Sequence, residues 1–175
     1  MMCIILAICT ALVLYADTYR HKNNKIQQLI DILFEFLLRA DEKGAGSSKT
    51  GASYMFMGLL LTAILFPKGL AINAWLILIV SDSLAAIVGM RFAGYKIYNN
   101  KTLEGSIVFF ISSVLISVFS YFWVAHYTAF AVIIVSCFIT TMVELFSGSK
   151  YLKINDNFTI PLSYGLSSIL LNLFR

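Results

Sequence analysis

Charged residues are scarce in this chain of 175 residues, in which Asp, Glu, Lys and Arg together make up 13%. Hydrophobic residues make up 59%, and the mean hydropathy is +0.84. Soluble domains carry about 25% charged residues, because a fold this small leaves much of its surface in water. The shortage excludes a soluble enzyme, a disordered protein and a nucleic-acid-binding arm. It predicts a single integral membrane domain over residues 1–175.

Cysteine is also rare, and its pattern indicates neither a disulfide framework nor a zinc site. Cys3, Cys9 and Cys137 lie in apolar runs without CxxC or Cys/His spacing, so we interpret them as small hydrophobic residues. No basic residue precedes the first apolar run, which we therefore expect to be a retained helix and not a secretory signal.

Long apolar runs dominate the remaining sequence. A helix needs about 20 residues to cross a bilayer, and these runs are continuously apolar, whereas the strands of membrane barrels alternate. The sequence therefore predicts an all-α fold, a polytopic membrane bundle of about six transmembrane helices. The runs cover residues 1–16, 51–66, 70–89, 105–124, 127–146 and 158–174.

Residues 26–38, IQQLIDILFEFLL, are too short to span a membrane. Asp31 and Glu35 are four residues apart and share one helical face, which predicts an interfacial amphipathic helix. A helix buried among the others is the alternative.

The charge distribution predicts the orientation. If residues 17–50, 90–104 and 147–157 share one side of the membrane, that side holds eleven of the thirteen Lys and Arg, and only Lys68 and Arg175 lie opposite. The positive-inside rule makes the richer side cytoplasmic. All nine acidic residues lie on that side or can be reached from it. We therefore expect the active site to face the cytoplasm.

Asp82 lies inside an apolar helix, LILIVSDSLAAIVG. A carboxylate at such a position costs about 2.5–3.5 kcal/mol on insertion scales, so it needs a cation, a partner or a water-filled cavity. Intramembrane acids are usually functional, and we expect a functional role here. The structural alternative is a polar pair involving Ser81 or Ser83.

Small residues follow Asp82, namely Ala85, Gly89 and Gly94. They fit equally well a packing seam between helices and a backbone that a phosphate approaches closely. A loop with Arg91, Lys96 and Lys101 comes next, and residues 102–106 open the next helix. Cations beside free N–H groups at a helix N-terminus predict an anion site. A positive-inside loop with an ordinary helix cap is the alternative.

Residues 81–106, SDSLAAIVGMRFAGYKIYNNKTLEGS, resemble the CTP-binding segment of the polyprenol (dolichol), diacylglycerol and phytol kinase family of membrane proteins. The family pattern is D-x-x-A-x-x-x-G, a second glycine, a basic loop and K-T-x-E-G-S. The matching residues are Asp82, Ala85, Gly89, Gly94, Lys101, Thr102, Glu104, Gly105 and Ser106.

Weaker matches flank this segment, so the resemblance covers roughly residues 17 to 165. They are Arg39 and Glu42 before Thr50-Gly51, Glu144 at the end of a helix, and Asp156-Asn157 before Pro161. No segment matches the R-K-x-x-H-like motif with which many bacterial members begin.

The resemblance implies a Mg²⁺-dependent transfer of a phosphoryl group from CTP to a lipid alcohol such as a polyprenol or diacylglycerol. Phosphoryl transfer needs cations around the phosphates and carboxylates that hold the metal. We expect catalytic roles for Asp82, Glu104 and Lys101, and metal ligation by Asp82, Asp156 and Glu144. The expected nucleotide-binding residues are Ala85, Gly89, Arg91, Gly94, Lys96, Lys101, Thr102, Gly105, Ser106 and Asn157.

Two other functions stay open. A phosphatidate cytidylyltransferase would use similar acids and cations to make a CDP-lipid. A non-enzymatic transporter would use Asp82 as an ion site, but the other five predicted spans lack a charge near their centres.

Overall fold

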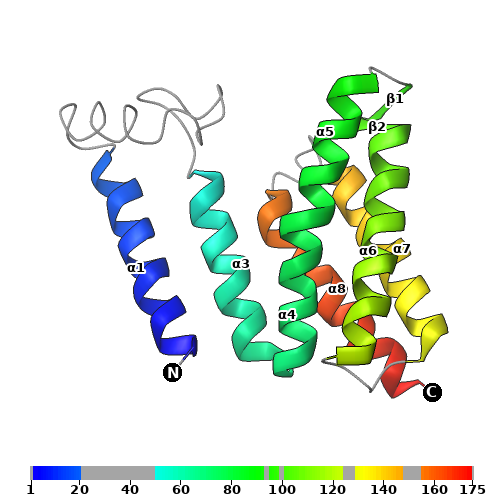
Figure 1. Cartoon of the computed structure of the whole chain (residues 1–175). Helices are drawn as coiled ribbons and strands as arrows, with labels where there is room; N and C mark the ends of the chain where they lie inside the picture. The colour runs from blue at the N-terminus through cyan, green and yellow to red at the C-terminus, as the bar shows by residue number, and fades with distance from the viewer. Residues whose placement is uncertain are drawn as a thin grey trace.

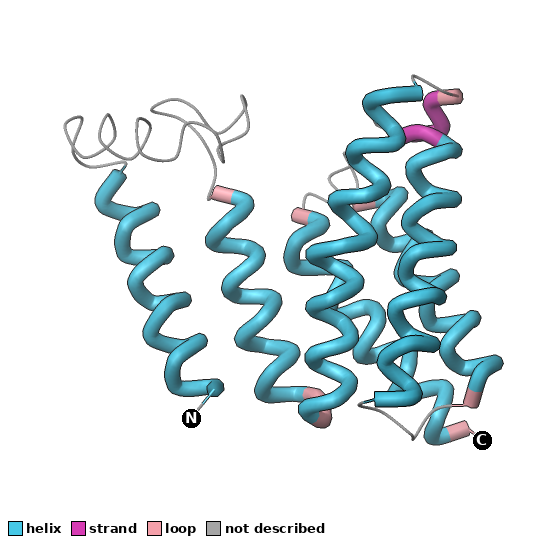
Figure 2. Tube along the Cα trace, viewed as in Figure 1, coloured by secondary structure: helices cyan, strands magenta, loops and turns pink. Residues whose placement is uncertain are grey.

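The computed structural model is a bundle of α-helices with one short β-hairpin (Figures 1 and 2). It describes residues 2–20, 50–92, 95–98, 101–123, 129–147 and 155–174. A helix covers most of the described part of each apolar run, which confirms the predicted all-α class. The helices are α1 (Met2–Arg20), α3 (Gly51–Leu65), a continuous α4 (Lys68–Leu76), η2 (Ile77–Ser81) and α5 (Asp82–Phe92), then α6 (Leu103–Trp123), α7 (Phe130–Phe146) and α8 (Asp156–Leu173).

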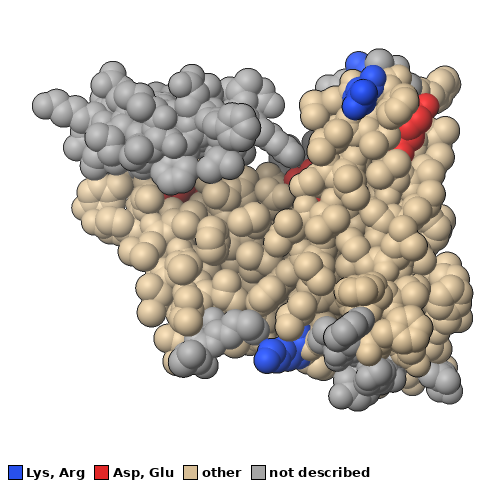
Figure 3. Space-filling model, viewed as in Figure 1, with Lys and Arg blue, Asp and Glu red and all other residues tan. Residues whose placement is uncertain are grey.

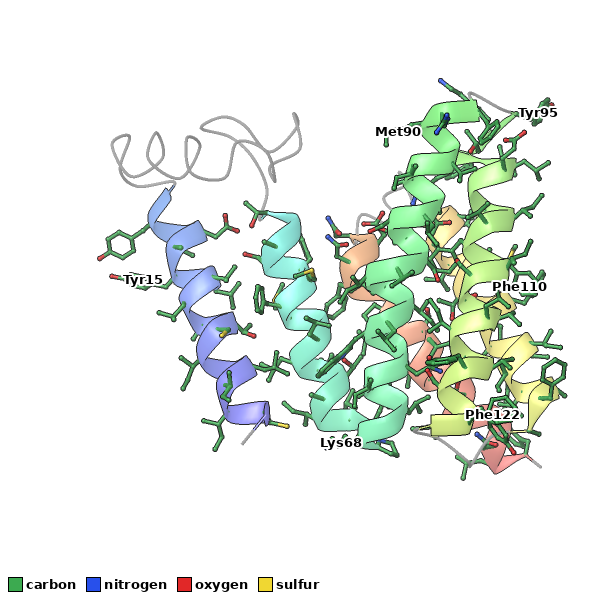
Figure 4. All side chains as sticks on the ribbon, viewed as in Figure 1. Tyr15, Lys68, Met90, Tyr95, Phe110 and Phe122 are labelled. Atoms are coloured by element: carbon green, nitrogen blue, oxygen red, sulfur yellow. The ribbon has the colours of Figure 1, made fainter. Side chains whose placement is uncertain are left out.

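The helices run alternately up and down, so that the two chain termini lie at the same end (Figure 1). The opposite end carries the hairpin of β1 (Lys96–Tyr98) and β2 (Lys101–Thr102), which pair antiparallel. We call it the hairpin end. Lys68 lies at the end of the bundle that carries the two chain termini, and Met90 and Tyr95 lie at the hairpin end (Figure 4). The ends of α1 and α7 and the starts of α3 and α8 also lie at the hairpin end, as the charge distribution predicts for the segments that they border (Figure 1).

The expected polar segment 90–104 is shorter than predicted at both edges. Helix α5 continues to Phe92, and α6 already begins at Leu103. Thr102 explains the early start, because its hydroxyl accepts a hydrogen bond from the Gly105 amide at 3.2 Å and satisfies a free donor of the first turn. Between the two helices, part of the expected loop is the hairpin, which the sequence did not predict.

Helix α6 shows how polar and apolar residues are distributed in the bundle. Its exposed residues include Leu115 and Phe119, which are 65% and 66% exposed, whereas Ser113 and Ser117 are buried. A soluble helix buries its apolar face. The arrangement on α6 is typical of helices in lipid, where small and hydroxyl-bearing residues pack between helices. The sides of the bundle that Figure 3 displays are correspondingly uncharged between the two ends.

Two helices are long and apolar enough to cross a membrane by themselves, within the part of the chain that the structure describes. They are Lys68–Phe92 and Leu103–Phe122. Shorter apolar helices cover Cys3–Tyr19, Gly51–Leu65 and Phe130–Phe146. The predicted count of six spans therefore goes beyond what the helix lengths establish.

A buried network of polar side chains holds α4, α6 and α8 together. The Asn73 side-chain Nδ2 donates to the Tyr164 hydroxyl at 2.6 Å, and that hydroxyl donates to the Ser117 hydroxyl at 3.0 Å. The Ser120 hydroxyl donates to the side-chain Oδ1 of Asn73 at 3.1 Å. Paired in this way, the polar groups avoid the cost of burial without a partner and fix how the three helices pack.

Several predictions lie outside the described residues. These are the amphipathic helix at 26–38, the weaker pattern matches at Arg39 and Glu42, and Gly94.

Candidate functional site

Asp82 comes directly after an irregular turn of helix. The five residues Ile77–Ser81 form a π-helical turn between α4 and α5, and Asp82 is the first residue of α5. Such turns occur frequently at functional sites, because they shift the side chains beyond them. The hydroxyl of Ser83, which belongs to the alternative polar pair, donates to the Ile79 carbonyl of its own helix at 2.6 Å. The site therefore begins with an acid that a helix irregularity positions.

Lys101 brings together two acids from separate helices. Its ammonium, on β2, donates hydrogen bonds to the carboxylates of Glu144 near the end of α7 and Asp156 at the start of α8. The Lys101 Nζ to Asp156 Oδ2 distance is 3.3 Å. The two acidic side chains are only 3% and 10% exposed, whereas that of Lys101 is 27% exposed. We call Lys101, Glu144 and Asp156 the ion cluster.

The pKa of Lys101 shows the electrostatic character of this cluster. Burial acts to lower it, but the negative charges of Glu144, Asp156 and, to a smaller extent, Asp82 outweigh burial and raise the pKa of Lys101 above its ordinary value of 10.5. The Coulombic effect of Asp82 places that acid within electrostatic reach of the cluster. Three expected metal ligands, Glu144, Asp156 and Asp82, thus act on the charge of Lys101, which is itself an expected site residue.

Among the predicted site residues, two buried carboxylate oxygens have no hydrogen-bond partner in the described part of the chain. They are Oε2 of Glu144 and Oε2 of Glu104, which lies in the first turn of α6. A buried acceptor without a partner is costly and needs a proton, a water or a cation. Both therefore have capacity for a ligand.

The ion cluster has the donor chemistry of a Mg²⁺ site, because carboxylate oxygens are the ligands that this ion prefers. Glu144 and Asp156 converge on one cation, the Lys101 ammonium, and Glu144 has a spare oxygen. No group of three acidic, His or Cys side chains within the described ranges stands ready to hold a metal. Of the three predicted metal ligands, Glu144 and Asp156 both contact the Lys101 ammonium, and Asp82 lies within electrostatic reach of that ammonium.

Gly89 and Gly105 lie where α5 and α6 pack closely. A Cβ added to Gly105 would lie 3.0 Å from the carbonyl oxygen of Ala85, and one added to Gly89 would lie 2.9 Å from the Thr102 hydroxyl. Ala85 is itself buried. At these positions the geometry favours the packing interpretation over close approach of a phosphate.

The remaining predicted nucleotide-binding residues differ in their surroundings. Arg91 and Lys96 are exposed at the hairpin end, where Figure 3 shows basic side chains. Ser106 is buried, and its hydroxyl has no partner in the described part of the chain. The side-chain Nδ2 of Asn157 donates to the Gly51 backbone carbonyl at 3.2 Å, so it joins α8 to the start of α3. Arg91, Lys96 and Ser106 therefore remain available to a ligand.

Asp17 is an acid whose role the sequence did not reveal. It lies near the end of α1, and its Oδ2 accepts hydrogen bonds of 2.9 Å from the Thr50 amide and the Ser53 hydroxyl at the start of α3. A carboxylate at a helix N-terminus is stabilised by the helix dipole and by the free amides. The contact joins the end of α1 to the start of α3. Two features of the sequence could have indicated this contact. Asp17 directly follows an apolar run, and hydroxyl-bearing residues, Thr50 and Ser53, stand at the start of the next one.

Two known proteins are similar to this chain. The uncharacterized protein RP860 of Rickettsia prowazekii (strain Madrid E) is 46% identical over 165 residues, which cover 94% of this chain and 79% of that protein. The uncharacterized protein MJ1137 of Methanocaldococcus jannaschii is 37% identical over 112 residues, or 63% of this chain and 53% of that protein. No family model and no solved structure matches. From its identity and coverage, the chain belongs to the same family as the Rickettsia protein RP860.

Proposed function

We propose that the protein is an integral membrane lipid kinase that transfers the terminal phosphoryl group of a nucleoside triphosphate, with CTP as the expected donor, to a lipid alcohol. The observation that carries this proposal is the ion cluster. Lys101, Glu144 and Asp156 meet at the hairpin end of a bundle whose exterior is apolar. A water-soluble donor and a membrane-bound acceptor would meet at such a place.

The proposal includes a membrane arrangement in which all six helices span the bilayer and the hairpin end faces the cytoplasm. It is supported by the exposed apolar side chains of α1, α6 and α7, such as Leu12, Leu115 and Phe138. At 1.5 Å per residue, the 15 residues of α3 give about 23 Å, which is shorter than a hydrocarbon core of about 30 Å. Local thinning of the bilayer accommodates such a mismatch at modest cost.

Catalysis of phosphoryl transfer depends mainly on positioning the two substrates and stabilising charge, and less on covalent chemistry by the protein. Lys101 would hold phosphate oxygens, and Glu144 and Asp156, together with Asp82, would hold Mg²⁺. The ion, when bound, would neutralise charge that develops on the phosphates. The lipid oxygen would bond to the terminal phosphorus while the bond to the leaving nucleoside diphosphate breaks. Either Glu104 or Asp82 would accept the proton of the lipid hydroxyl.

Glu104 is supported as the acceptor of that proton by its surroundings. One of its carboxylate oxygens is buried without a partner among the described residues, so a bound hydroxyl would satisfy it. Exposed apolar side chains lie on either side of it in the chain, at Leu103 and Ile107. A lipid tail in the bilayer could lie along them while its hydroxyl reaches the carboxylate.

The test uses purified protein, Mg²⁺, a panel of polyprenols, phytol and diacylglycerols, and CTP labelled at either the γ- or the α-phosphate. A kinase moves the γ-label to the lipid and leaves the α-label on CDP. A cytidylyltransferase, assayed with phosphatidate, moves the α-label to the lipid and leaves the γ-label on pyrophosphate. ATP and UTP tested in parallel give the donor base. Lipid that gains neither label would refute an enzymatic role with these substrates.

A further inference from the structure

The position of Lys101 has a consequence for how the proposed kinase site binds its metal, and the inference drawn from it rests on that proposed function. The ammonium donates to both Glu144 and Asp156, the two acids that would ligate Mg²⁺. Mg²⁺ requires oxygen ligands at about 2.0–2.1 Å in near-octahedral geometry. An ammonium group and a divalent cation compete for Glu144 Oε1 and Asp156 Oδ2, the oxygens that Lys101 occupies, because the two positive charges repel and need the same space.

Of the three partners, Lys101 is the one able to move. Glu144 lies in the last turn of α7 and Asp156 in the first turn of α8, and both side chains are nearly buried. Lys101 lies on a strand of two residues, and its side chain is 27% exposed. The neighbouring residue Thr102 caps α6 and so fixes the backbone beside Lys101. The long side chain of Lys101 can therefore change direction without a movement of the backbone.

The charge of the site also favours an exchange. The single positive charge of Lys101 faces the negative charges of Glu144 and Asp156, and Asp82 is a third acid within electrostatic reach. A divalent cation balances these acids better than one ammonium does. The phosphates of a nucleotide would then offer the displaced ammonium a new anionic partner.

We propose that Lys101 is a displaceable internal cation, which occupies the metal-binding carboxylates in the empty protein and moves to the nucleotide phosphates when a divalent cation takes its place. The two ligands then bind with positive cooperativity, because the metal frees the ammonium that the phosphates bind. Without a nucleotide, the metal has to compete with Lys101.

The first test measures Mn²⁺ binding to the full chain by electron paramagnetic resonance without a nucleotide. Lys101→Gln should bind Mn²⁺ about ten- to a hundredfold more tightly than the wild type, because no charge-assisted bond has to be broken. Lys68→Gln, which removes one positive charge at the other end of the bundle, should bind like the wild type. Equal or weaker Mn²⁺ binding by Lys101→Gln would overturn the exchange.

The second test needs no substitution and covers the case in which Lys101→Gln does not fold. A water-soluble acetylating reagent modifies the wild-type protein, and mass spectrometry monitors each lysine. Rising Mg²⁺ should accelerate acetylation of Lys101, whereas Lys68 should keep its rate, and added CTP should slow Lys101 again. A Lys101 rate independent of Mg²⁺ overturns the exchange. Wild-type activity on CTP, measured separately, decides the proposed function whatever the acetylation shows.

Discussion

The ammonium of Lys101 donates a hydrogen bond to the carboxylate of Glu144, a residue 43 positions further along the chain. Lys101 also reaches Asp156, which is 55 positions away. One short strand and the facing ends of two helices therefore meet at one cation. Because removing one member would leave a buried charge without compensation, the three residues are coupled and should respond to mutation together.

The first prediction concerns which side of the membrane each end of the bundle faces. Single cysteines are introduced at Lys68 and at Lys96 in a background in which the three native cysteines are replaced. A membrane-impermeant maleimide applied to sealed, right-side-out vesicles should label position 68, and position 96 only after the vesicles are opened. The physical reason is the positive-inside distribution of basic residues. Labelling of both positions from the same side would contradict the arrangement.

Asp82→Asn should abolish phosphoryl transfer and leave the yield of folded protein nearly unchanged. The substitution removes a metal-ligating charge from the proposed site, yet it also relieves the cost of a carboxylate within an apolar helix. Activity is measured with γ-labelled CTP, and folding by thermal unfolding in detergent. Ser83→Ala, at the next residue, loses only a hydroxyl bonded to its own helix and serves as the control. Near-normal turnover by Asp82→Asn would make this acid structural.

The helices and their alternating directions could be predicted from the sequence, because both depend on local properties. A run of apolar residues long enough to cross a bilayer is helical wherever its backbone polar groups must be satisfied without water. Alternating directions then bring the polar segments to one end. The same reasoning places Asp82, Lys101 and Asp156 at the hairpin end without any knowledge of their contacts.

The partners within that end could not be predicted, because they depend on side chains that tertiary packing brings together. From the sequence we expect Lys101 to bind phosphate oxygens. In the structure its ammonium donates hydrogen bonds to Glu144 and Asp156, which the sequence did not predict. The π-helical turn before Asp82 and the short strands of the hairpin are likewise too brief to leave a periodic pattern. Asp17 was missed because its partners begin 33 residues later.

Gly58→Ala should destabilise the bundle by about 1–3 kcal/mol through overpacking. A Cβ at this position would lie 2.9 Å from the Asn157 carbonyl oxygen and 3.2 Å from the Phe158 Cα, and both are backbone atoms of α8 that cannot move alone. Helices α3 and α8 would have to separate. Thermal unfolding in detergent measures the effect, and Ala52→Ser at an exposed position of α3 should change little. An unaltered unfolding temperature for Gly58→Ala would mean that α3 and α8 are less tightly packed.

The contribution of the ion cluster to stability should persist into alkaline solution. The pKa of Lys101 is raised in the folded protein above its ordinary value of 10.5. Its stabilising charge is therefore fully present below about pH 10.5 and is lost as the pH rises through the folded-state pKa. The difference in unfolding temperature between the wild type and Lys101→Met should stay constant from about pH 6 to pH 9 and shrink only above about pH 10.5. A decline near neutral pH would show that another group controls the cluster.

Lys101→Ala should weaken CTP binding in the presence of Mg²⁺ by about ten- to a hundredfold. An ammonium bound to phosphate oxygens contributes a charge-assisted hydrogen bond of about 1.5–3 kcal/mol, and about 1.4 kcal/mol corresponds to a tenfold change. Lys101→Arg should recover part of the loss, because the charge survives while the planar guanidinium fits differently. Isothermal titration with CTP provides the measurement, and Lys68→Ala at the opposite end is the control. If Lys101 merely marks the cytoplasmic side, both alanine variants will bind CTP as the wild type does, and the anion site at the hairpin end will have to be given up.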